Sequence, residues 1–217
     1  MRIYAHRGAS STYPENTIEA FAEAVRLGSD GVELDVQATA DGIPVVIHDV
    51  SLLRTTSIDR VVSSLTLTDL NLIAPSVPTL ADVLAMVGDK LHFDLEIKQA
   101  GIEQNVLDVL AKSPESTWAA SSFDWNVIRA FRGLNPTADL WLLGMTWNQA
   151  MADAAVEVGA TAAALFAGIV NQQTVEQVHT AGLQLMVWTV NDAARHRQLR
   201  EWGVDMLCTD APHQFVP

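Results

Sequence analysis

The feature that most constrains the fold is a regular alternation of apolar, strand-like runs with helix-periodic segments along the 217 residues. Parallel strands need a crossover of about a dozen residues, and helices supply it, so this order predicts a parallel sheet covered by helices. The predicted strands are Ile3–His6, Gly31–Val36, Pro44–His48, Leu91–Ile97, Thr117–Ser121, Asp139–Leu143, Thr161–Phe166, Leu183–Thr189 and Asp205–Thr209. The predicted helices are Thr17–Leu27, Thr79–Val87, Ile102–Lys112, Trp125–Arg132, Asn148–Val158, Gln172–Ala181 and Asp192–Trp202.

One gap between strands is too short for a crossover. Asp41-Gly42 lies in it, and Asp-Gly between alternating runs is a strong signal for a two-residue hairpin, so Pro44–His48 should form an antiparallel arm. Eight parallel strands remain, the number that closes a βα barrel. The sequence therefore predicts one α/β domain over residues 1–217, a (β/α)8 TIM-type barrel. Residues 50–78 form a small insertion above its C-terminal face, and the last helix is missing or vestigial because only eight residues follow Thr209.

Composition excludes several classes of partner. With 13 Lys and Arg against 26 Asp and Glu, the formal net charge is −13, which disfavours binding to nucleic acid or anionic membranes. Any phosphate that the protein handles must therefore meet a local positive charge. Cys208 is the single cysteine and is expected in the core, without an internal disulfide. Together with the absence of an export signal or membrane span, this predicts a cytoplasmic protein without stable membrane insertion.

Hairpin geometry brings titratable groups together on one face. If Asp41 and Gly42 are the turn residues, Asp35 lies directly opposite His48, with Cβ atoms about 4.5 to 5.5 Å apart. Glu33, two residues before Asp35, points the same way because side chains alternate along a strand. An inward carboxylate in a closed barrel is costly unless it is paired or bound to metal, so a functional role is favoured over a structural one.

A second acidic strand repeats this design, with Asp94, Glu96 and Lys98 on one face. Glu33, Asp35 and Glu96 would form an all-oxygen site at the barrel rim, suited to a hard divalent cation, Mg²⁺ or Ca²⁺, rather than zinc. Asp94 is expected one layer deeper.

Cations and histidines complete the predicted site. Arg7 and Lys98 lie at strand ends and would make a local anion site fit for a phosphate. His6 ends the first strand on the same rim as His48, and the two would form the acid/base pair that phosphodiester cleavage needs. The other histidines lack such company and receive no role: His92, His179, His196 and His213.

Motifs distributed over the whole chain resemble those of the glycerophosphodiester phosphodiesterases. They are His6-Arg7-Gly8, Pro14-Glu15-Asn16-Thr17, Glu33-Leu34-Asp35-Val36, Thr39-x-Asp41-Gly42, Val45-x-x-His48-Asp49, Pro78-Thr79-Leu80, Glu96-Ile97-Lys98, Ser122-Phe123, Trp188-Thr189-Val190-Asn191 and Thr209-Asp210-x-Pro212. The resemblance implies a metal-dependent βα barrel that hydrolyses glycerophosphodiesters to glycerol 3-phosphate and an alcohol. It puts the acid/base histidines on His6 and His48, the metal ligands on Glu33, Asp35 and Glu96, and the phosphate contacts on Arg7 and Lys98.

Two aromatic residues are further candidates for the substrate pocket. Trp188 ends the seventh parallel strand and would pack against the glycerol backbone or the alcohol group, and Phe123 is a weaker candidate for the same wall. The expected partner is a small glycerophosphodiester such as glycerophosphocholine, and a homodimer is left open. One alternative is a lysophospholipase D activity, which needs an exposed apolar rim from the leucines of residues 50–78. The other is a non-catalytic barrel that binds a phosphate ligand.

Overall fold

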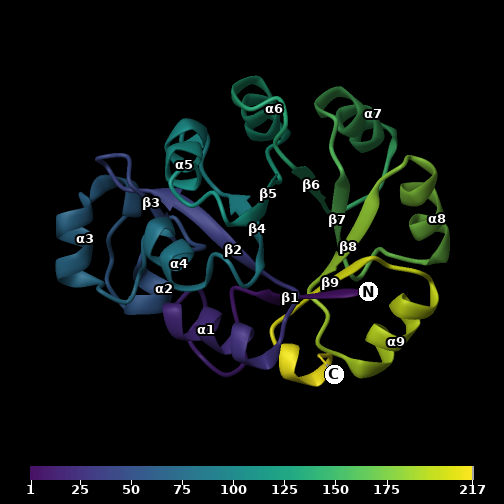
Figure 1. Cartoon of the computed structure of the whole chain (residues 1–217), viewed down its shortest axis with the longest axis horizontal. Coiled ribbons are helices and arrows are strands. Elements are labelled where there is room, and N and C mark those ends of the chain that lie inside the picture. The colour runs from purple at the N-terminus through teal and green to yellow at the C-terminus, as the bar shows by residue number, and fades with distance from the viewer. Residues whose placement is uncertain (217) are drawn as a thin grey trace.

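Eight parallel strands close into a barrel, and helices surround it in chain order (Figure 1). The computed structural model describes residues 1–216. Strand β1 pairs with both β2 and β9, which closes the sheet and confirms the predicted TIM-type barrel. The barrel strands are β1 (Arg2–His6), β2 (Gly31–Ala38), β4 (His92–Ile97), β5 (Thr117–Ser122), β6 (Leu140–Gly144), β7 (Ala162–Phe166), β8 (Gln184–Trp188) and β9 (Met206–Thr209).

The helices of the outer layer begin and end where local signals place them. Thr17 accepts a hydrogen bond from the Ala20 amide at the start of the first helix, and Gly28, with φ of 80°, ends it. A single 3₁₀ turn, η2 (Pro212–Gln214), follows β9, so the last helix is vestigial as predicted. The outer helices are α1 (Ile18–Leu27), α4 (Leu80–Val87), α5 (Glu103–Leu110), α6 (Trp125–Leu134), α7 (Gln149–Val158), α8 (Gln172–Thr180) and α9 (Ala193–Glu201).

Apolar side chains fill two separate spaces. A large cluster lies between the strands and the helices and includes Phe21, Leu34 and Leu95. A second cluster lies inside the barrel and includes Tyr4, Trp141 and Met206. Tyr4 and Trp141 meet edge to face with ring centroids 5.8 Å apart, and both are almost completely buried. The barrel interior is therefore a packed core, as in other barrels of this type.

The antiparallel arm forms, but not in the predicted register. Strand β3 (Pro44–Val46) pairs antiparallel to β2, with Val36 opposite Val46, so Asp35 lies opposite Ile47 and not His48. The Thr39 amide donates to the Ile43 carbonyl, which closes a three-residue loop over residues 40–42 instead of the predicted two-residue turn. Gly42 has φ of 78°, the left-handed residue that such a loop requires. The prediction was wrong by one residue because the loop is one residue longer.

Contacts of the Asp41 side chain explain the longer loop. Its carboxylate accepts hydrogen bonds from the Thr39 hydroxyl at 2.6 Å and from the Leu67 amide at 3.0 Å. Leu67 belongs to the insertion, so a contact with a segment far along the chain helps to set the turn. Local sequence signals for hairpins do not contain this information.

The insertion of residues 50–78 packs beside the arm, at the left of Figure 1. It contains α2 (Leu53–Thr56), the 3₁₀ turn η1 (Val62–Ser64) and α3 (Leu67–Ile73). Leu52, Leu65 and Leu70 join Val45 and other arm residues in a third buried cluster. Most of the apolar side chains of the insertion are therefore used to attach it to the arm, whereas Leu53 and Leu72 are exposed.

Candidate active site

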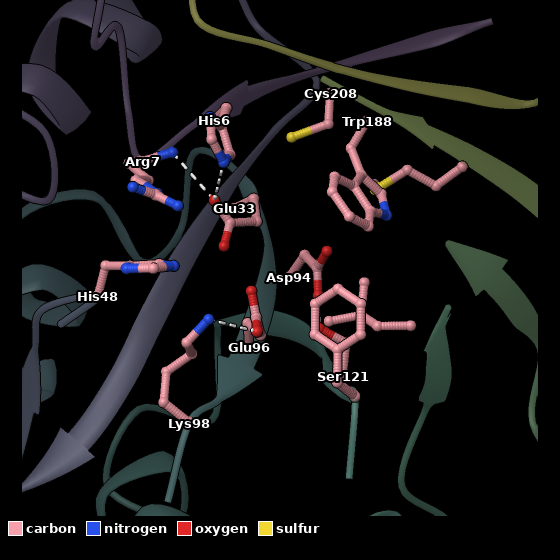
Figure 2. A pocket seen from close by; sticks show the side chains of 13 residues that line it. His6, Arg7, Glu33, His48, Asp94, Glu96, Lys98, Ser121, Trp188 and Cys208 are labelled. Atoms are coloured by element: carbon pink, nitrogen blue, oxygen red, sulfur yellow. Dashed lines mark hydrogen bonds and ion pairs between the residues drawn. The ribbon is translucent and has the colours of Figure 1, made fainter. Parts of the chain in front are cut away.

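Three carboxylates converge at the C-terminal ends of two neighbouring strands (Figure 2). Glu33 and Asp35 come from β2 and Glu96 from β4, and in the barrel Asp35 lies beside Glu96 in register. One oxygen of each carboxylate lies within 4.8 Å of one oxygen of the other two. Asp35 is fully buried, and Glu33 nearly so. The structure thus brings together all three residues that the sequence proposed as metal ligands.

Unmet hydrogen bonding in this cluster fits a hard cation. Asp35 Oδ2 accepts a hydrogen bond from Asn16 Nδ2 at 2.8 Å, but among residues 1–216 Asp35 Oδ1 has no hydrogen-bond donor. The Lys98 ammonium lies 3.6 Å from Asp35 Oδ1, too far for a good hydrogen bond. A buried carboxylate oxygen in this state costs free energy, which a divalent cation with oxygen ligands would offset.

The pKa values of Glu33 and Glu96 reflect the same lack of compensating positive charge. Burial, followed by repulsion from Asp35, raises the pKa of Glu33 well above its usual value. The same two causes raise the pKa of Glu96, although the Lys98 ammonium at 2.7 Å from Glu96 Oε1 opposes them. Three buried carboxylates without enough positive charge around them form a site that favours a cation.

Two basic side chains face the acids. Burial opposes the charges of Arg7 and Lys98, but the surrounding carboxylates outweigh it and raise the pKa of both groups. Arg7 Nε lies 3.1 Å from Asp35 Oδ2, and the Arg7 amide donates to Glu33. Arg7 has φ of 57°, a left-handed conformation that is costly for a residue with a side chain and recurs at ligand sites. Both cations line the pocket, where they could meet an anion.

In both histidines of the pocket, Nδ1 is hydrogen-bonded to a carboxylate. His6 Nδ1 donates to Asp210 Oδ1 at 2.6 Å, and His48 Nδ1 donates to Asp49 Oδ1 at 2.6 Å. Because a carboxylate only accepts hydrogen bonds, the Nδ1 atoms carry the protons and the Nε2 atoms remain available. His6 Nε2 lies 3.8 Å from Glu33 Oε2, inside the pocket. This arrangement suits proton transfer at Nε2.

His48 reaches the pocket by a route that the sequence did not predict. The predicted strand pairing with Asp35 is wrong, and β3 ends at Val46, two residues before His48. Gln37 Nε2 instead donates to the carbonyl groups of Ile47, His48 and Asp49, which holds this segment across the barrel rim. His48 still lines the same pocket as Glu33 and Glu96.

Three further charged residues, Arg54, Glu15 and Asp49, link His48 to Arg7. Arg54, from α2 of the insertion, binds Asp49 Oδ2 through Nε at 2.5 Å and both oxygens of Glu15 at 2.7 and 2.8 Å. Glu15 Oε1 in turn accepts from Arg7 at 3.0 Å. Hydrogen bonding by Arg54 lowers the pKa of Asp49 to about 2. Sequence reasoning gave no role to Asp49, Asp210, Glu15 or Arg54, although Asp49 directly follows His48.

The opposite wall of the pocket is apolar. Leu143, Met186 and Cys208 line it together with the two predicted aromatic residues, Trp188 and Phe123. The rings of Trp188 and Phe123 meet edge to face with centroids 5.5 Å apart. Figure 2 shows Arg7, His48 and Lys98 on one side of the pocket and Trp188 and Cys208 on the other. Cys208 is buried as predicted, and burial raises the pKa of its thiol.

Asp94 also lines the pocket, two residues before Glu96 on β4 and beside Glu33 of β2 in register, so it lies deeper than Glu96 but not deeper than Glu33. Its side chain is almost completely buried, and burial raises its pKa to about 7.

Histidines that received no role lie elsewhere. His92 bonds Tyr4 and stacks on Trp141, His179 pairs with Asp205, and His196 stacks on Phe215.

Comparisons with known proteins identify the family of this chain. Residues 6–214 match the model of the glycerophosphoryl diester phosphodiesterase family. A glycerophosphodiester phosphodiesterase of Caldanaerobacter subterraneus is 32% identical, over 99% of this chain and 96% of that protein.

Solved structures share the fold. A glycerophosphodiester phosphodiesterase of Thermotoga maritima has 27% identity and a TM-score of 0.86, over 99% of this chain and 96% of that one. A phosphodiesterase of Oleispira antarctica, solved in complex with the product sn-glycerol-3-phosphate, has 24% identity and a TM-score of 0.91, over 99% and 94%. Within the described residues, no helix has the length and apolar character needed to cross a membrane. The resemblance seen in the motifs is confirmed: the chain belongs to the glycerophosphoryl diester phosphodiesterase family, a family of phosphoric diester hydrolases.

Proposed function

We propose that this protein hydrolyses water-soluble glycerophosphodiesters, such as glycerophosphocholine, to glycerol 3-phosphate and an alcohol. A divalent cation, Mg²⁺ or Ca²⁺, would be held by Glu33, Asp35 and Glu96. The observation that carries this proposal is the meeting of three acids, two cations and two oriented histidines in one pocket. A cytoplasmic location agrees with the single free thiol of Cys208.

The charged side of the pocket would bind the phosphate. A metal bound to the three carboxylates would neutralise them and polarise a phosphoryl oxygen. Arg7 and Lys98 then bind the other phosphoryl oxygens and stabilise the negative charge that increases in the transition state. Their ion pairs with the acids keep both side chains in the pocket before substrate arrives. With a divalent cation bound, the local charge would become positive and offset the repulsion expected from a protein of net charge −13.

His6 and His48 move the protons. One Nε2 accepts the proton of the attacking hydroxyl group, the new P–O bond forms, and the bond to the leaving alcohol breaks. The other imidazole donates its own Nε2 proton to the leaving oxygen, so that the alcohol departs neutral. Asp210 and Asp49 act as positioning residues because they fix each ring and stabilise its protonated form. The attacking group is either water or the adjacent glycerol hydroxyl, which would give a cyclic phosphate that water opens afterwards.

A chelator experiment tests this proposal. Purified protein is incubated with glycerophosphocholine and with glycerophosphoethanolamine, and the reaction is followed by ³¹P NMR. Signals of glycerol 3-phosphate should increase with added Mg²⁺ or Ca²⁺ and stop after excess EDTA. A transient signal of a cyclic phosphate would identify the glycerol hydroxyl as the first nucleophile. Hydrolysis that continues unchanged in EDTA would reject the metal role, and binding without any turnover would favour the non-catalytic barrel.

The lysophospholipase D alternative has less support. It needs an exposed apolar rim, but of the six leucines of the insertion only Leu53 and Leu72 are exposed, and Leu52, Leu65 and Leu70 are buried against the arm. Lysophosphatidylcholine should therefore be a much poorer substrate than glycerophosphocholine in the same assay.

A further inference from the structure

Asp94 presents an unused hydrogen-bond acceptor on the floor of the pocket. Its side chain projects inward from β4, two residues before Glu96, and is 1% exposed. Ser121 donates to Asp94 Oδ1 at 2.6 Å, but Asp94 Oδ2 is buried and has no hydrogen-bond partner among residues 1–216. Asp94 also lies outside the group of three acids whose oxygens are close enough to share one ion. A buried acceptor of this kind is costly unless a ligand or water supplies a donor.

The surroundings of Asp94 restrict the chemistry of that ligand. Leu143 and Met186 of the pocket wall carry no strong hydrogen-bonding groups. Trp188 contributes a buried indole N–H that, in the described part of the chain, has no acceptor. In Figure 2, Asp94 lies between Glu96 and Trp188. An unused acceptor and an unused donor on an otherwise apolar wall match an alcohol, because a hydroxyl group both donates and accepts.

The spacing along β4 indicates which hydroxyl group this is. Asp94 lies two residues before Glu96, roughly 6.6 Å along the strand, and beside Glu33 of β2 in register. The phosphate is expected at the level of Glu96, Arg7 and Lys98. In a glycerophosphodiester, the C2 hydroxyl is next to the esterified carbon, and the C1 hydroxyl is one carbon further from phosphorus. A group bound below the phosphate at the floor is therefore the terminal, C1 hydroxyl.

We propose that Asp94 binds the terminal hydroxyl group of the substrate's glycerol and so restricts the enzyme to deacylated glycerophosphodiesters. This inference rests on the proposed function. An acyl ester at C1 has no proton to donate to Asp94 Oδ2 and would place its oxygen acceptors against that unpaired carboxylate oxygen. Asp94 thus determines specificity, while Glu33, Asp35, Glu96 and the two histidines serve the chemistry.

The test compares two substrates that differ in this hydroxyl group alone. The first is glycerophosphocholine, and the second is 2-hydroxypropyl phosphocholine, which keeps the C2 hydroxyl and lacks the C1 hydroxyl. The parent enzyme should prefer glycerophosphocholine in kcat/KM by about 10- to 100-fold, the range expected for one hydrogen bond to a charged group. Asp94→Leu should bring that ratio close to one, mainly by loss of activity on glycerophosphocholine.

Control variants separate specificity from folding and from metal binding. Leu95→Ile changes the neighbouring side chain, which is buried in the outer core of the same strand, and should keep the parental ratio. Asp94→Asn keeps an acceptor for Ser121 and provides a second, better-tolerated variant. If Asp94→Leu does not fold, Asp94→Asn takes its place in the test. We expect Asp94→Asn to lower the preference for glycerophosphocholine only in part. Thermal-shift titration with Mg²⁺ should give the same apparent metal affinity for parent and Asp94 variants.

Three outcomes would count against the inference. Equal loss on both substrates would mean that Asp94 serves the general architecture. A clear loss of Mg²⁺ affinity would make Asp94 a metal ligand. A parent enzyme that hydrolyses both substrates equally well would show that the C1 hydroxyl is not bound. If the parent hydrolyses neither substrate with metal present, the proposed function itself fails, and this result is distinct from the other three.

Discussion

His6 and His48 offer the same nitrogen to the pocket, but two different regions hold them. His6 ends β1, which is hydrogen-bonded to β2 on one side and to β9 on the other, and Asp210 just after β9 orients its ring. His48 lies beyond the end of β3, outside any strand ladder, and Asp49 and Arg54 orient it from the arm and the insertion. The closed barrel thus positions a residue through strand register, and the arm positions one through side-chain hydrogen bonds.

Arg54 and Glu15 join these two regions. Arg54 contacts Asp49 beside His48, and Glu15, which follows β1, contacts both Arg54 and Arg7. The arm is consequently tied to the phosphate-binding side of the barrel by ion pairs. Loss of barrel residues should affect the whole site, whereas loss of arm residues should act mainly through His48.

The largest effect is expected for Glu33→Gln, which changes the barrel side. Activity with Mg²⁺ should fall to the level of the parent in EDTA, because the metal site loses a charged ligand. Metal-free thermal stability should not fall, since Gln removes a buried charge that Asp35 and Glu96 repel. Differential scanning fluorimetry with and without Mg²⁺ measures both effects. A variant that is still stabilised by Mg²⁺ like the parent would contradict the ligand assignment.

The second-largest effect is expected from removing either histidine. His6→Ala and His48→Ala should each lower kcat by about 10²- to 10⁴-fold, the usual contribution of one acid/base group. The double variant should be little worse than either single one, because the two groups act in one reaction. Circular dichroism confirms that each variant is folded. Near-parental turnover in either single variant would remove that histidine from the mechanism.

A smaller effect should follow from Arg54→Gln, which changes the arm side alone. We expect about a 10-fold lower kcat, in the range known for residues that orient a functional side chain. In a His48→Ala background the same substitution should have little further effect, because its main target is already gone. Arg129→Gln, which breaks an exposed ion pair with Glu157 on the helical surface, is the matched control. Additive losses in the double variant would place Arg54 in another role.

The pH dependence of this arm contact has a definite sign. Arg54 holds the pKa of Asp49 at about 2, below its ordinary value of 3.8, so the pair stabilises the folded state above about pH 4. That stabilisation is lost as the pH falls from about 4 through 2 and Asp49 becomes protonated. Urea midpoints of the parent and Arg54→Gln should therefore differ most at neutral pH and converge as the pH falls to about 2.

The smallest effect is expected for Gly42→Ala in the loop of the arm. Gly42 has φ of 78°, and an added Cβ would lie 2.9 Å from Asn105 Nδ2, so we expect a loss of about 1 to 2 kcal/mol in the free energy of unfolding. Gly101→Ala is a suitable control because Gly101 has a similar φ, 86°, with no described atom within 4 Å of the added Cβ. A larger loss for Gly42→Ala than for Gly101→Ala would measure the contribution of the contact with Asn105. Equal losses would assign the whole effect to backbone strain.

Much of the barrel half of the site could be predicted from sequence. Strand alternation places Glu33 and Asp35, and likewise Asp94 and Glu96, on one face of their strands, and parallel strands end at the same edge. These rules depend on neighbouring residues and on the regular geometry of a closed sheet. The structure accordingly puts all three acids together, although β2 runs two residues further than predicted and β4 begins one residue later.

The arm half could be predicted only in outline. Asp41-Gly42 correctly indicated a reversal of the chain into an antiparallel arm. The register was wrong because a hydrogen bond from the Leu67 amide, 26 residues away, helps to hold a three-residue loop. His48 nevertheless lines the pocket because Gln37 binds three successive carbonyl groups of its segment.

The sequence by itself therefore determined the barrel, the family and the identity of the acids, cations and histidines, because these depend on local periodicity and on motif order. Only the tertiary structure decided the register of the arm, the carboxylates that orient each imidazole, and the bridge from Arg54 to Glu15. It also revealed the free oxygen of Asp94. The physical reason is that these features depend on distances of a few ångströms between residues far apart in the chain, and neither spacing nor composition specifies such distances.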